Sequence, residues 1–331
     1  MWFEELMGFT EENPSQVRQN CCCEDGMLRS LVNGAEYHIG EFELVSLGEL
    51  RDRTAASAFD SAIEIQEVVG DVQEMHRDPE NEGALFQVAS QFNLLEMTGP
   101  GVTPERGVGI YQYDKTQGPA CAIACGAGTI YRNYFIPVAG QTGQSESYQL
   151  DGLAGLGGAL GNQNGDLWTM RNGYALPSLE GLLAIQKRLS DASEASLDNY
   201  RSLLQFGWHK DTQVTIGGSR HRVGQIYCSA LPIAYSEVGS RAVWEPFARL
   251  VLEAAYEATI RAALLNCEST GNQNIYLTLL GGGAFGNVSS WIIDAIRRAL
   301  LTVEASGLKV SIVSYGGPRK VVSDLVAEFQ Q

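Results

Sequence analysis

The sequence predicts an α/β fold in which helices cover both faces of one sheet. Short apolar runs typical of buried strands alternate along the chain with segments of helical periodicity. One of these runs, residues 274–280, stops at three successive glycines, after which an amphipathic pattern begins. The length of 331 residues and the hydrophobic fraction of 44% allow one sizeable core. We therefore expect a single domain over residues 1–331.

The first third of the chain carries helix, hairpin and strand signals in turn. Residues 3–20 are expected to form a helix. Asn33-Gly34 separates two short extended runs, which indicates a β-hairpin. Ser46 and Glu49 have the spacing of a capping box, so a helix is expected to start there. Two strands are expected to follow, at residues 62–69 and 83–90.

The remaining elements are expected in an alternating order. Residues 117–135 start with Gln-Gly-Pro and continue with small residues, which indicates one helix packed closely against the sheet. From residue 136 to about residue 170 the chain is rich in Gly, Gln and Asn, which is typical of a surface excursion. After it we expect a strand or hairpin at 167–177, helices at 178–190 and 196–206, strands at 212–218 and 223–235, a helix at 244–266, a strand at 274–280, a helix at 288–303 and a strand at 308–317.

The charge limits the classes of ligand. The formal net charge is −16 and no run of basic residues is present, so nucleic acid would be repelled. A small anion could still bind if backbone N–H groups held it in place of lysine and arginine. A cationic target, such as a surface that bears arginine, would be favoured by the field of the protein.

Targeting and cysteine patterns point to an intracellular protein. No window of 18 apolar residues is present, and the acidic start lacks the basic and apolar pattern of a signal peptide. We therefore expect a soluble, cytoplasmic protein without a membrane partner. The seven cysteines are irregularly spaced, which does not suggest a disulfide framework. Cys21–Cys23 and His38 could be imagined as a metal site, but they lack the Cys-x-x-Cys pair of such sites, and an exposed turn of reduced cysteines is favoured. We therefore expect no metal and no cofactor.

The glycine loop at residues 281–286 has three possible readings. Gly281, Gly283 and Gly286 satisfy G-x-G-x-x-G, but the strand after the loop ends without the acid that a dinucleotide-binding unit needs for its ribose. A tight turn alone would not need three glycines, which cost about 0.5–1 kcal/mol each in conformational entropy. Close approach of the backbone to a phosphate explains them better, and Phe285 could then cover the ligand.

A second motif gives the chain a resemblance to a known family. Gly70-Asp71-Val72 follows a predicted strand, and after the next strand comes Asn93. Macrodomains carry these segments in the same order, followed by a loop of the form G-x-G-x-F-G. The sequence therefore resembles the macrodomain family over residues 62–98 and 223–316. The resemblance implies a mixed sheet flanked by helices, with residues 1–60 as an N-terminal extension and residues 136–222 as a large insertion. The whole chain looks most like the MavL-type arginine-specific ADP-ribosyl hydrolases. The glycine-rich first loop of the family is not present as Gly-Gly-Gly; residues 94–107 and 113–128 occupy that region.

The resemblance implies a site for ADP-ribose. Asp71 would accept a hydrogen bond from the adenine amino group, and Asn93 would contact the distal ribose. The second glycine loop would surround the diphosphate, and Tyr315 would lie beside the adenine. Asp71 could instead cap a turn, and Tyr315 could be an ordinary residue at a strand end. The expected ADP-ribose-binding residues are Asp71, Val72, Gln91, Asn93, Gly118, Gly282, Gly283, Ala284, Phe285, Gly286, Asn287 and Tyr315.

Hydrolysis of the bound ligand would require carboxylates. The reaction passes through an oxocarbenium-like state, and an acid near the distal ribose can activate water. If the leaving group is a guanidinium, a second acid can pair with it. The expected catalytic residues are Glu237, which follows a buried strand, and Glu245, Glu253 and Glu257, which share a helical stripe with Arg249. Such a stripe can also be a solvated helix face, and Asp114 and Glu96 are further candidates.

The sequence thus predicts binding of ADP-ribose and hydrolysis of mono-ADP-ribose from the arginine side chains of a protein partner. A reader module that binds ADP-ribose without cutting it is the main alternative. An NAD-dependent oxidoreductase of the Rossmann type is a more distant one. Carboxylates that face the distal ribose would distinguish the hydrolase from the reader.

Overall fold

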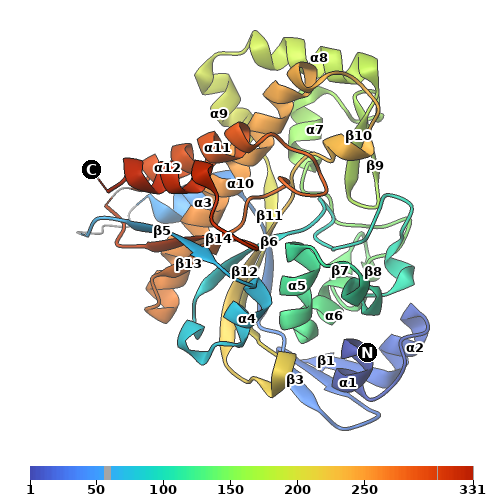
Figure 1. Ribbon diagram of the computed structural model, residues 1–331. Helices are drawn as coiled ribbons and strands as arrows, with labels where there is room; N and C mark the ends of the chain where they lie inside the picture. Colours follow the sequence, from blue (N-terminus) through green and yellow to red (C-terminus); the bar gives the residue numbers. More distant parts are fainter. Residues whose placement is uncertain (56–60, 304, 331) are drawn as a thin grey trace.

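The fold is built on one mixed seven-stranded sheet, seen in Figure 1 in a computed structural model that describes residues 1–55, 61–303 and 305–330. The last residues of the predicted extension, 56–60, therefore lie outside the described residues. Across the sheet the strand order is β4 (Glu41–Ser46), β11 (Gln205–Gln213), β12 (Arg222–Cys228), β6 (Leu85–Ala89), β13 (Asn274–Leu277), β14 (Lys309–Ser314) and β5 (Glu64–Val69). The last five are mutually parallel, and β11 is antiparallel to both of its neighbours. The predicted α/β class with a mixed sheet is confirmed.

Helices cover both faces because alternate side chains of the strands point to opposite sides. In β6, Leu85 belongs to one core cluster, whereas Phe86 and Val88 belong to another. The first face is covered by α3 (Leu47–Thr54), α10 (Arg241–Thr270), α11 (Ser289–Leu301) and α12 (Lys320–Glu328). The second is covered by α4 (Val72–Arg77), α5 (Gln117–Ala124) and α6 (Gly126–Tyr134). The helices α4 and α12 were not expected from the sequence.

Whereas the later part of the predicted N-terminal extension supplies β4 and α3 to the main fold, its first part forms a small subdomain beside α5 and α6. It contains α1 (Trp2–Met7), α2 (Pro14–Asn20), β1 (Cys21–Glu24), β2 (Met27–Ser30) and β3 (Glu36–His38). The single helix predicted over residues 3–20 is wrong, because Gly8 ends α1 at a φ of 77° and Pro14 starts α2. The hairpin at Asn33-Gly34 is confirmed between β2 and β3, and so is the capping box at Ser46 and Glu49. Cys21 is buried in β1 instead of lying in an exposed turn.

The segment 136–222 supplies both peripheral elements and one strand of the main sheet, next to its edge strand. Its peripheral part contains β7 (Pro137–Val138), β8 (Gln141–Thr142), α7 (Ala154–Leu160), β9 (Trp168–Arg171), β10 (Tyr174–Pro177), α8 (Leu179–Ser190) and α9 (Glu194–Ser202). The strand expected at 212–218 lies earlier, as β11, and joins the main sheet. The helix expected at 117–135 is two helices, α5 and α6, separated by Cys125 at φ −110° and ψ 60°. Among the described residues, no helix is both long and apolar enough to cross a membrane.

Candidate active site

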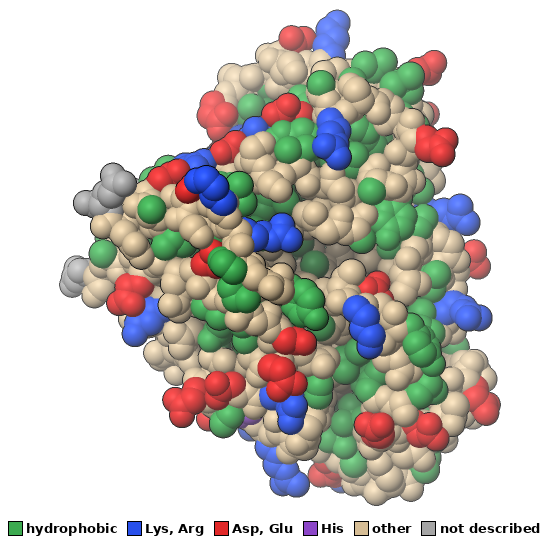
Figure 2. All heavy atoms as spheres, in the orientation of Figure 1, with side chains coloured by type: hydrophobic (Ala, Val, Ile, Leu, Met, Phe, Trp, Pro, Cys, Tyr) green, Lys and Arg blue, Asp and Glu red, His purple; other side chains and the backbone are tan. Residues whose placement is uncertain are grey.

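A cleft of about 680 Å³ opens at the carboxyl ends of β5, β13 and β14. In open α/β sheets this edge is the usual place for ligands. The lining residues come from segments that are far apart in the sequence, among them Asp71, Asp114, Gly282, Gly283 and Tyr315. Figure 2 shows a hollow near the middle of this face, with Lys or Arg side chains on two sides of it.

Asp71 lies at the mouth of the cleft and has a structural task as well. Its Oδ1 accepts a hydrogen bond of 2.8 Å from the backbone N–H of Gln73, so Asp71 is the N-cap of α4. Its side chain is exposed, and the neighbouring Val72 is buried in the core. The capping alternative is therefore confirmed, and it leaves the exposed carboxylate facing the cleft.

The glycine loop after β13 forms one wall of the cleft. Gly281 and Gly286 have φ values of 71° and 74°, which favour glycine. At Gly281 a Cβ would lie 2.4 Å from the Cβ of Ala230, so no larger residue fits. Asn287 is buried and holds the loop, because its Nδ2 donates to the carbonyl oxygen of Leu231 at 2.9 Å.

The tip of this loop offers backbone donors. Gly282, Gly283 and Ala284 are exposed, and the first two line the cleft. Within the described part of the chain, the N–H groups of Gly283, Ala284 and Phe285 donate no hydrogen bond. Free N–H groups of successive residues are suited to binding an anion.

The opposite wall is the segment that leads into α5. Asp114 Oδ1 accepts a 2.8 Å hydrogen bond from the backbone N–H of Thr116 and is half-buried. Gln117 fixes the first turn of α5 to β6, since its Oε1 accepts from the N–H of Ala89 and its Nε2 donates to a β6 carbonyl. Gly118 is buried, and a Cβ there would lie 2.0 Å from the Ala89 oxygen. Gly118 therefore brings α5 close to the sheet and does not itself line the cleft.

Three aromatic rings join the glycine loop to the hairpin β9–β10. The ring of Phe285 lies 5.5 Å from that of Tyr174 and 5.6 Å from that of Tyr235, centroid to centroid. Burial raises the pKa of Tyr174 above its ordinary value, with smaller contributions from Tyr235 and from the charge of Asp114. Asp114 therefore lies near enough to this aromatic cluster to act on it electrostatically.

The charges in the cleft are of both signs. In the part of the chain that the structure describes, the carboxylates that line it are Glu5, Asp71 and Asp114. Lys115 and Arg319 line it as well, and neither forms an ion pair with a described residue. In a protein with 39 acidic and 23 basic side chains, two cations that line one cleft and form no ion pair with a described residue favour an anionic ligand, although the charge of Arg319 also acts on Glu67.

Two expected ligand-binding residues are buried and do not line the cleft. Asn93 is fully buried; its Nδ2 donates to Gln149 at 2.8 Å and its Oδ1 accepts from the N–H of Leu95. Gln91 is also buried, and its Oε1 accepts from the N–H of Met97 at 2.8 Å. Both amides shape the turn after β6, so in this arrangement they support the site from within.

Glu96 is likewise buried, in an ion pair with Arg132. Its two oxygens lie 3.2 Å from Arg132 Nη2, and both side chains are almost completely shielded from solvent. Burial raises the pKa of Glu96 to about 7, although Arg132 opposes this shift. The carboxylate faces the protein interior and not the cleft, so its placement gives it no contact with a substrate.

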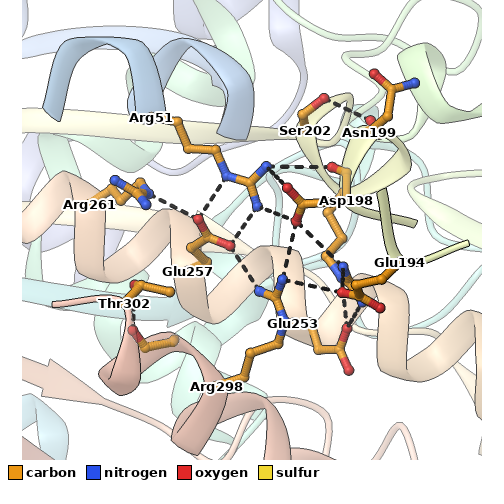
Figure 3. Close-up of polar contacts among 12 residues, drawn as sticks. Arg51, Glu194, Asp198, Asn199, Ser202, Glu253, Glu257, Arg261, Arg298 and Thr302 are labelled. Carbon is orange, nitrogen blue, oxygen red and sulfur yellow. Dashed lines mark hydrogen bonds and ion pairs between the residues drawn. The ribbon is translucent and has the colours of Figure 1, made fainter. Parts of the chain in front are cut away.

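The acidic stripe on α10 lies in a different place. Glu257 is 2% exposed and binds Arg51, Arg261 and Arg298 at 2.7, 3.0 and 3.0 Å. Figure 3 shows the three arginines converging on this carboxylate, with Asp198 between two of them. Burial alone would raise the pKa of Glu257, but hydrogen bonds from Arg51 and Arg261 lower it to about 2.

The other expected catalytic acids also lie outside the residues that line the cleft. Glu253 binds Arg201, with a distance of 2.7 Å between Glu253 Oε2 and Arg201 Nη2. Glu245 pairs with Arg249, one turn further along the same helix, at 2.7 Å. The expected roles of Glu245, Glu253 and Glu257 are therefore not matched by their positions, because arginines already hold them. Glu237 is exposed in a loop two residues after Tyr235, near the aromatic cluster.

Sequence reasoning overlooked several residues of the cleft. Lys115 and Arg319 lie in loops and belong to no motif. One signal was available, since Asp114 and Thr116 have the spacing of an Asx turn before a predicted helix. No group of three or more His, Cys, Asp or Glu side chains among the described residues is arranged to hold a metal ion, and the cysteines are free.

Comparisons with known proteins give distant structural neighbours. No protein-family model matches the chain, and no curated protein matches it in sequence. Poly(ADP-ribose) glycohydrolase from Thermomonospora curvata aligns with a TM-score of 0.45 and 11% identity, covering 96% of this chain and 97% of that one. The enzyme of the same name from Deinococcus radiodurans, in complex with ADP-ribose, aligns with a TM-score of 0.44 and 12% identity, covering 88% and 94%. Similarity at this level is too low to assign a function.

Proposed function

We propose that this protein binds ADP-ribose in the cleft and hydrolyses the bond that links ADP-ribose to arginine side chains of proteins. The observation that carries the proposal is the meeting of two distant motifs in one cavity. Asp71 and the loop at residues 281–286 are more than 200 positions apart in the sequence, yet both line the cleft. The loop contributes backbone donors, and Lys115 and Arg319, which line the same cleft, contribute cations suited to a diphosphate.

The proposed binding mode follows the order of groups along the cleft. Asp71 accepts a hydrogen bond from the adenine amino group, and the exposed ring of Tyr315 lies beside the base. The N–H groups of residues 283–285, with Lys115 and Arg319, bind the diphosphate. The distal ribose then lies toward Asp114 and the ring of Phe285.

The proposed reaction replaces a carbon–nitrogen bond with a carbon–oxygen bond. Asp114 takes a proton from water, and the oxygen of that water attacks C1 of the distal ribose. The bond from this carbon to the guanidinium nitrogen breaks, and that nitrogen takes up the proton that Asp114 received from water, so arginine leaves protonated and Asp114 returns to its carboxylate form. Asp114 lines the cleft, and its charge acts on Tyr174, whose ring lies 5.5 Å from that of Phe285, so we assign this task to Asp114.

A reader module without hydrolysis is the second candidate function. It is favoured by one observation, namely that Asp114 Oδ1 already accepts a hydrogen bond of 2.8 Å from the N–H of Thr116. Enzymes that cut glycosidic bonds commonly use two carboxyl groups. Glu237, in the neighbouring loop, is the acid that could complete such a pair.

The experiment that tests the proposed activity compares two matched substrates. Peptides that carry ADP-ribose on arginine or on glutamate are incubated with the protein, and free ADP-ribose is measured by chromatography. We expect release from the arginine-linked peptide and little from the other. If neither is cut while calorimetry shows binding of ADP-ribose, the reader function holds. If ADP-ribose does not bind, both proposals are wrong.

The double task of Asp71 allows its ligand contact to be tested separately from its cap. Serine is a good N-cap residue but has no carboxylate, so Asp71→Ser should fold normally. We expect this variant to bind ADP-ribose more weakly by about 1–3 kcal/mol, because the adenine amino group loses its acceptor. Calorimetry measures the affinity, and thermal unfolding checks the cap. Asp71→Ala, which loses both functions, is the comparison variant. Unchanged affinity in the serine variant would show that Asp71 only caps α4.

A further inference from the structure

The loop between β14 and α12 carries two residues of the cleft wall. Tyr315 is 80% exposed at its start and Arg319 is exposed at its end, and both line the cleft. Between them, Gly316 has a φ of 80°, and Gly317 follows. Among the described residues, the N–H groups of these two glycines find no hydrogen-bond acceptor. The centre of the loop therefore has no backbone hydrogen bond that could fix the two side chains.

A single carboxylate holds both ends of this loop. Glu67 Oε1 accepts a hydrogen bond of 2.6 Å from the hydroxyl of Ser314, just before the loop, and one of 2.7 Å from the backbone N–H of Arg319, at its end. Glu67 Oε2 accepts a third, of 2.9 Å, from the hydroxyl of Ser323 in α12. Glu67 is half-buried in β5 and does not line the cleft. It therefore joins the two ends of the loop without reaching the cleft itself.

The contacts of Glu67 stabilise its ionised form. Burial would raise the pKa of this carboxyl group, but the hydrogen bonds from Ser314, Arg319 and Ser323 lower the pKa below its ordinary value, and the charge of Arg319 adds to this effect. A negative charge is also favourable at the N-terminal end of α12, where Arg319 is the N-cap residue. Glu67 is therefore a carboxylate at neutral pH, with one oxygen bonded to both ends of the loop and the other to α12.

The strand that carries Glu67 also leads to the proposed adenine contact. Asp71 follows Glu67 by four residues, after β5 ends at Val69. The backbone N–H of Gly70 donates to the carbonyl oxygen of Ser314 at 3.1 Å, so the ends of β5 and β14 are joined beside the cleft. Figure 1 shows these two strands next to each other, with α12 above them. Glu67 therefore ties the loop to the segment that carries Asp71.

We infer that Glu67 is a positioning residue for ADP-ribose binding, which holds Tyr315 beside the adenine and Arg319 at the diphosphate without touching the ligand. The inference rests on the proposed function, which places the base and the diphosphate there. A loop that is ordered before the ligand arrives loses less conformational entropy on binding. The three hydrogen bonds of Glu67 supply this order, since the glycines between Tyr315 and Arg319 do not.

The sign of the effect separates positioning from simple electrostatics. If Glu67 only added negative charge near the cleft, its removal would strengthen the binding of an anion. If it positions the loop, Glu67→Ala should weaken ADP-ribose binding by at least about tenfold, because two long side chains must then be ordered on binding. Glu67→Gln should retain most of the affinity, since its amide can accept the bonds from Ser314 and Arg319 and donate to the Ser323 hydroxyl. Calorimetry with ADP-ribose measures the parent protein and both variants.

Further variants locate the effect. Glu64→Ala is the charge-matched control, because Glu64 is exposed at the end of β5 away from the cleft, and it should not change the affinity for ADP-ribose. In a protein that already carries Tyr315→Ala and Arg319→Ala, Glu67→Ala should cost little further affinity, because the side chains that it positions are gone. In hydrolysis of the arginine-linked peptide, Glu67→Ala should raise KM and leave kcat nearly unchanged, since Asp114 is held by the turn before α5 and not by this loop.

Three results would overturn the inference and leave the proposed function standing. They are unchanged or tighter binding of ADP-ribose by Glu67→Ala, an equal loss of affinity in Glu67→Gln, and an undiminished loss in the protein that lacks the Tyr315 and Arg319 side chains. If Glu67→Ala does not fold, Ser323→Ala decides, because it removes one of the three hydrogen bonds from outside the cleft. Weaker binding by Ser323→Ala then supports the inference, and unchanged binding overturns it. Failure of the parent protein to bind ADP-ribose would instead reject the proposed function.

Discussion

Asp114→Asn is expected to lower the rate of ADP-ribose release from arginine by about 10²–10⁴-fold, the usual contribution of general acid–base catalysis. An asparagine cannot accept the proton of the attacking water at neutral pH. Its Oδ1 can still accept the hydrogen bond from Thr116, so the turn before α5 should persist. Single-turnover hydrolysis of the arginine-linked peptide measures the effect, and calorimetry should show ADP-ribose binding close to that of the parent protein.

Two glutamates provide the controls for this experiment. Glu245→Gln removes a charge that Arg249 already holds outside the cleft, and it should cut at the parent rate. Glu237→Gln tests the exposed acid beside the aromatic cluster. If Asp114→Asn is fully active and Glu237→Gln is not, Glu237 is the carboxylate that acts on water. If both variants release ADP-ribose at the parent rate, neither Asp114 nor Glu237 acts on the attacking water.

Glu257→Ala is expected to destabilise the fold by about 3–5 kcal/mol, because three partly buried arginines lose the carboxylate they share, and Asp198 remains as a partner for Arg51 and Arg298 alone among the three. Three guanidinium groups meet at this carboxylate, as Figure 3 shows, and its side chain is 2% exposed. Urea unfolding followed by circular dichroism measures the loss. Glu245→Ala is the control on the same helix, since it breaks one half-exposed pair and should cost no more than about 1 kcal/mol.

The acid dependence of stability gives a second check on Glu257. Its pKa is lowered from 4.5 to about 2 in the folded protein, so its contribution to stability is present above pH 4.5 and is lost as the pH falls toward 2. The difference in unfolding free energy between the parent and Glu257→Gln should therefore shrink over this range. If Glu245→Ala and Glu257→Ala lower the free energy of unfolding by similar amounts, the prediction that Glu257 contributes more to stability than Glu245 is wrong.

The parts of the fold that could be predicted are those with local causes. The capping box at Ser46 and Glu49, the hairpin at Asn33-Gly34 and the apolar run of β6 each depend on neighbouring residues, and each was found in its place. The break between α5 and α6 was missed, because residues 117–135 contain no proline or polar run at that point. β11 was misplaced, because its residues Gln205–Gln213 mix polar and aromatic side chains without strict alternation.

The candidate site likewise has a part that could be predicted from the sequence and a part that could not. Asp71 and the glycine loop follow strands whose carboxyl ends share one edge, so their meeting could be expected. The role of Glu257 could not be judged from its spacing on α10. Its partners Arg51 and Arg298 come from other helices, and only the packing of those helices decides which face of α10 is neutralised. Lys115 and Arg319 reach the cleft from loops, whose positions depend on the whole fold.

The cluster around Glu257 also joins helices that are far apart in the sequence. Arg51 belongs to α3, and Asp198 belongs to α9 of the segment 136–222. Arg51 pairs with Glu257 of α10, and Asp198 pairs with Arg298 of α11. A chain without α3 would keep the pair between Asp198 and Arg298, and a chain without α9 would keep the pair between Arg51 and Glu257. The cluster therefore fastens the first 60 residues and the segment 136–222 to the same two core helices by separate ion pairs.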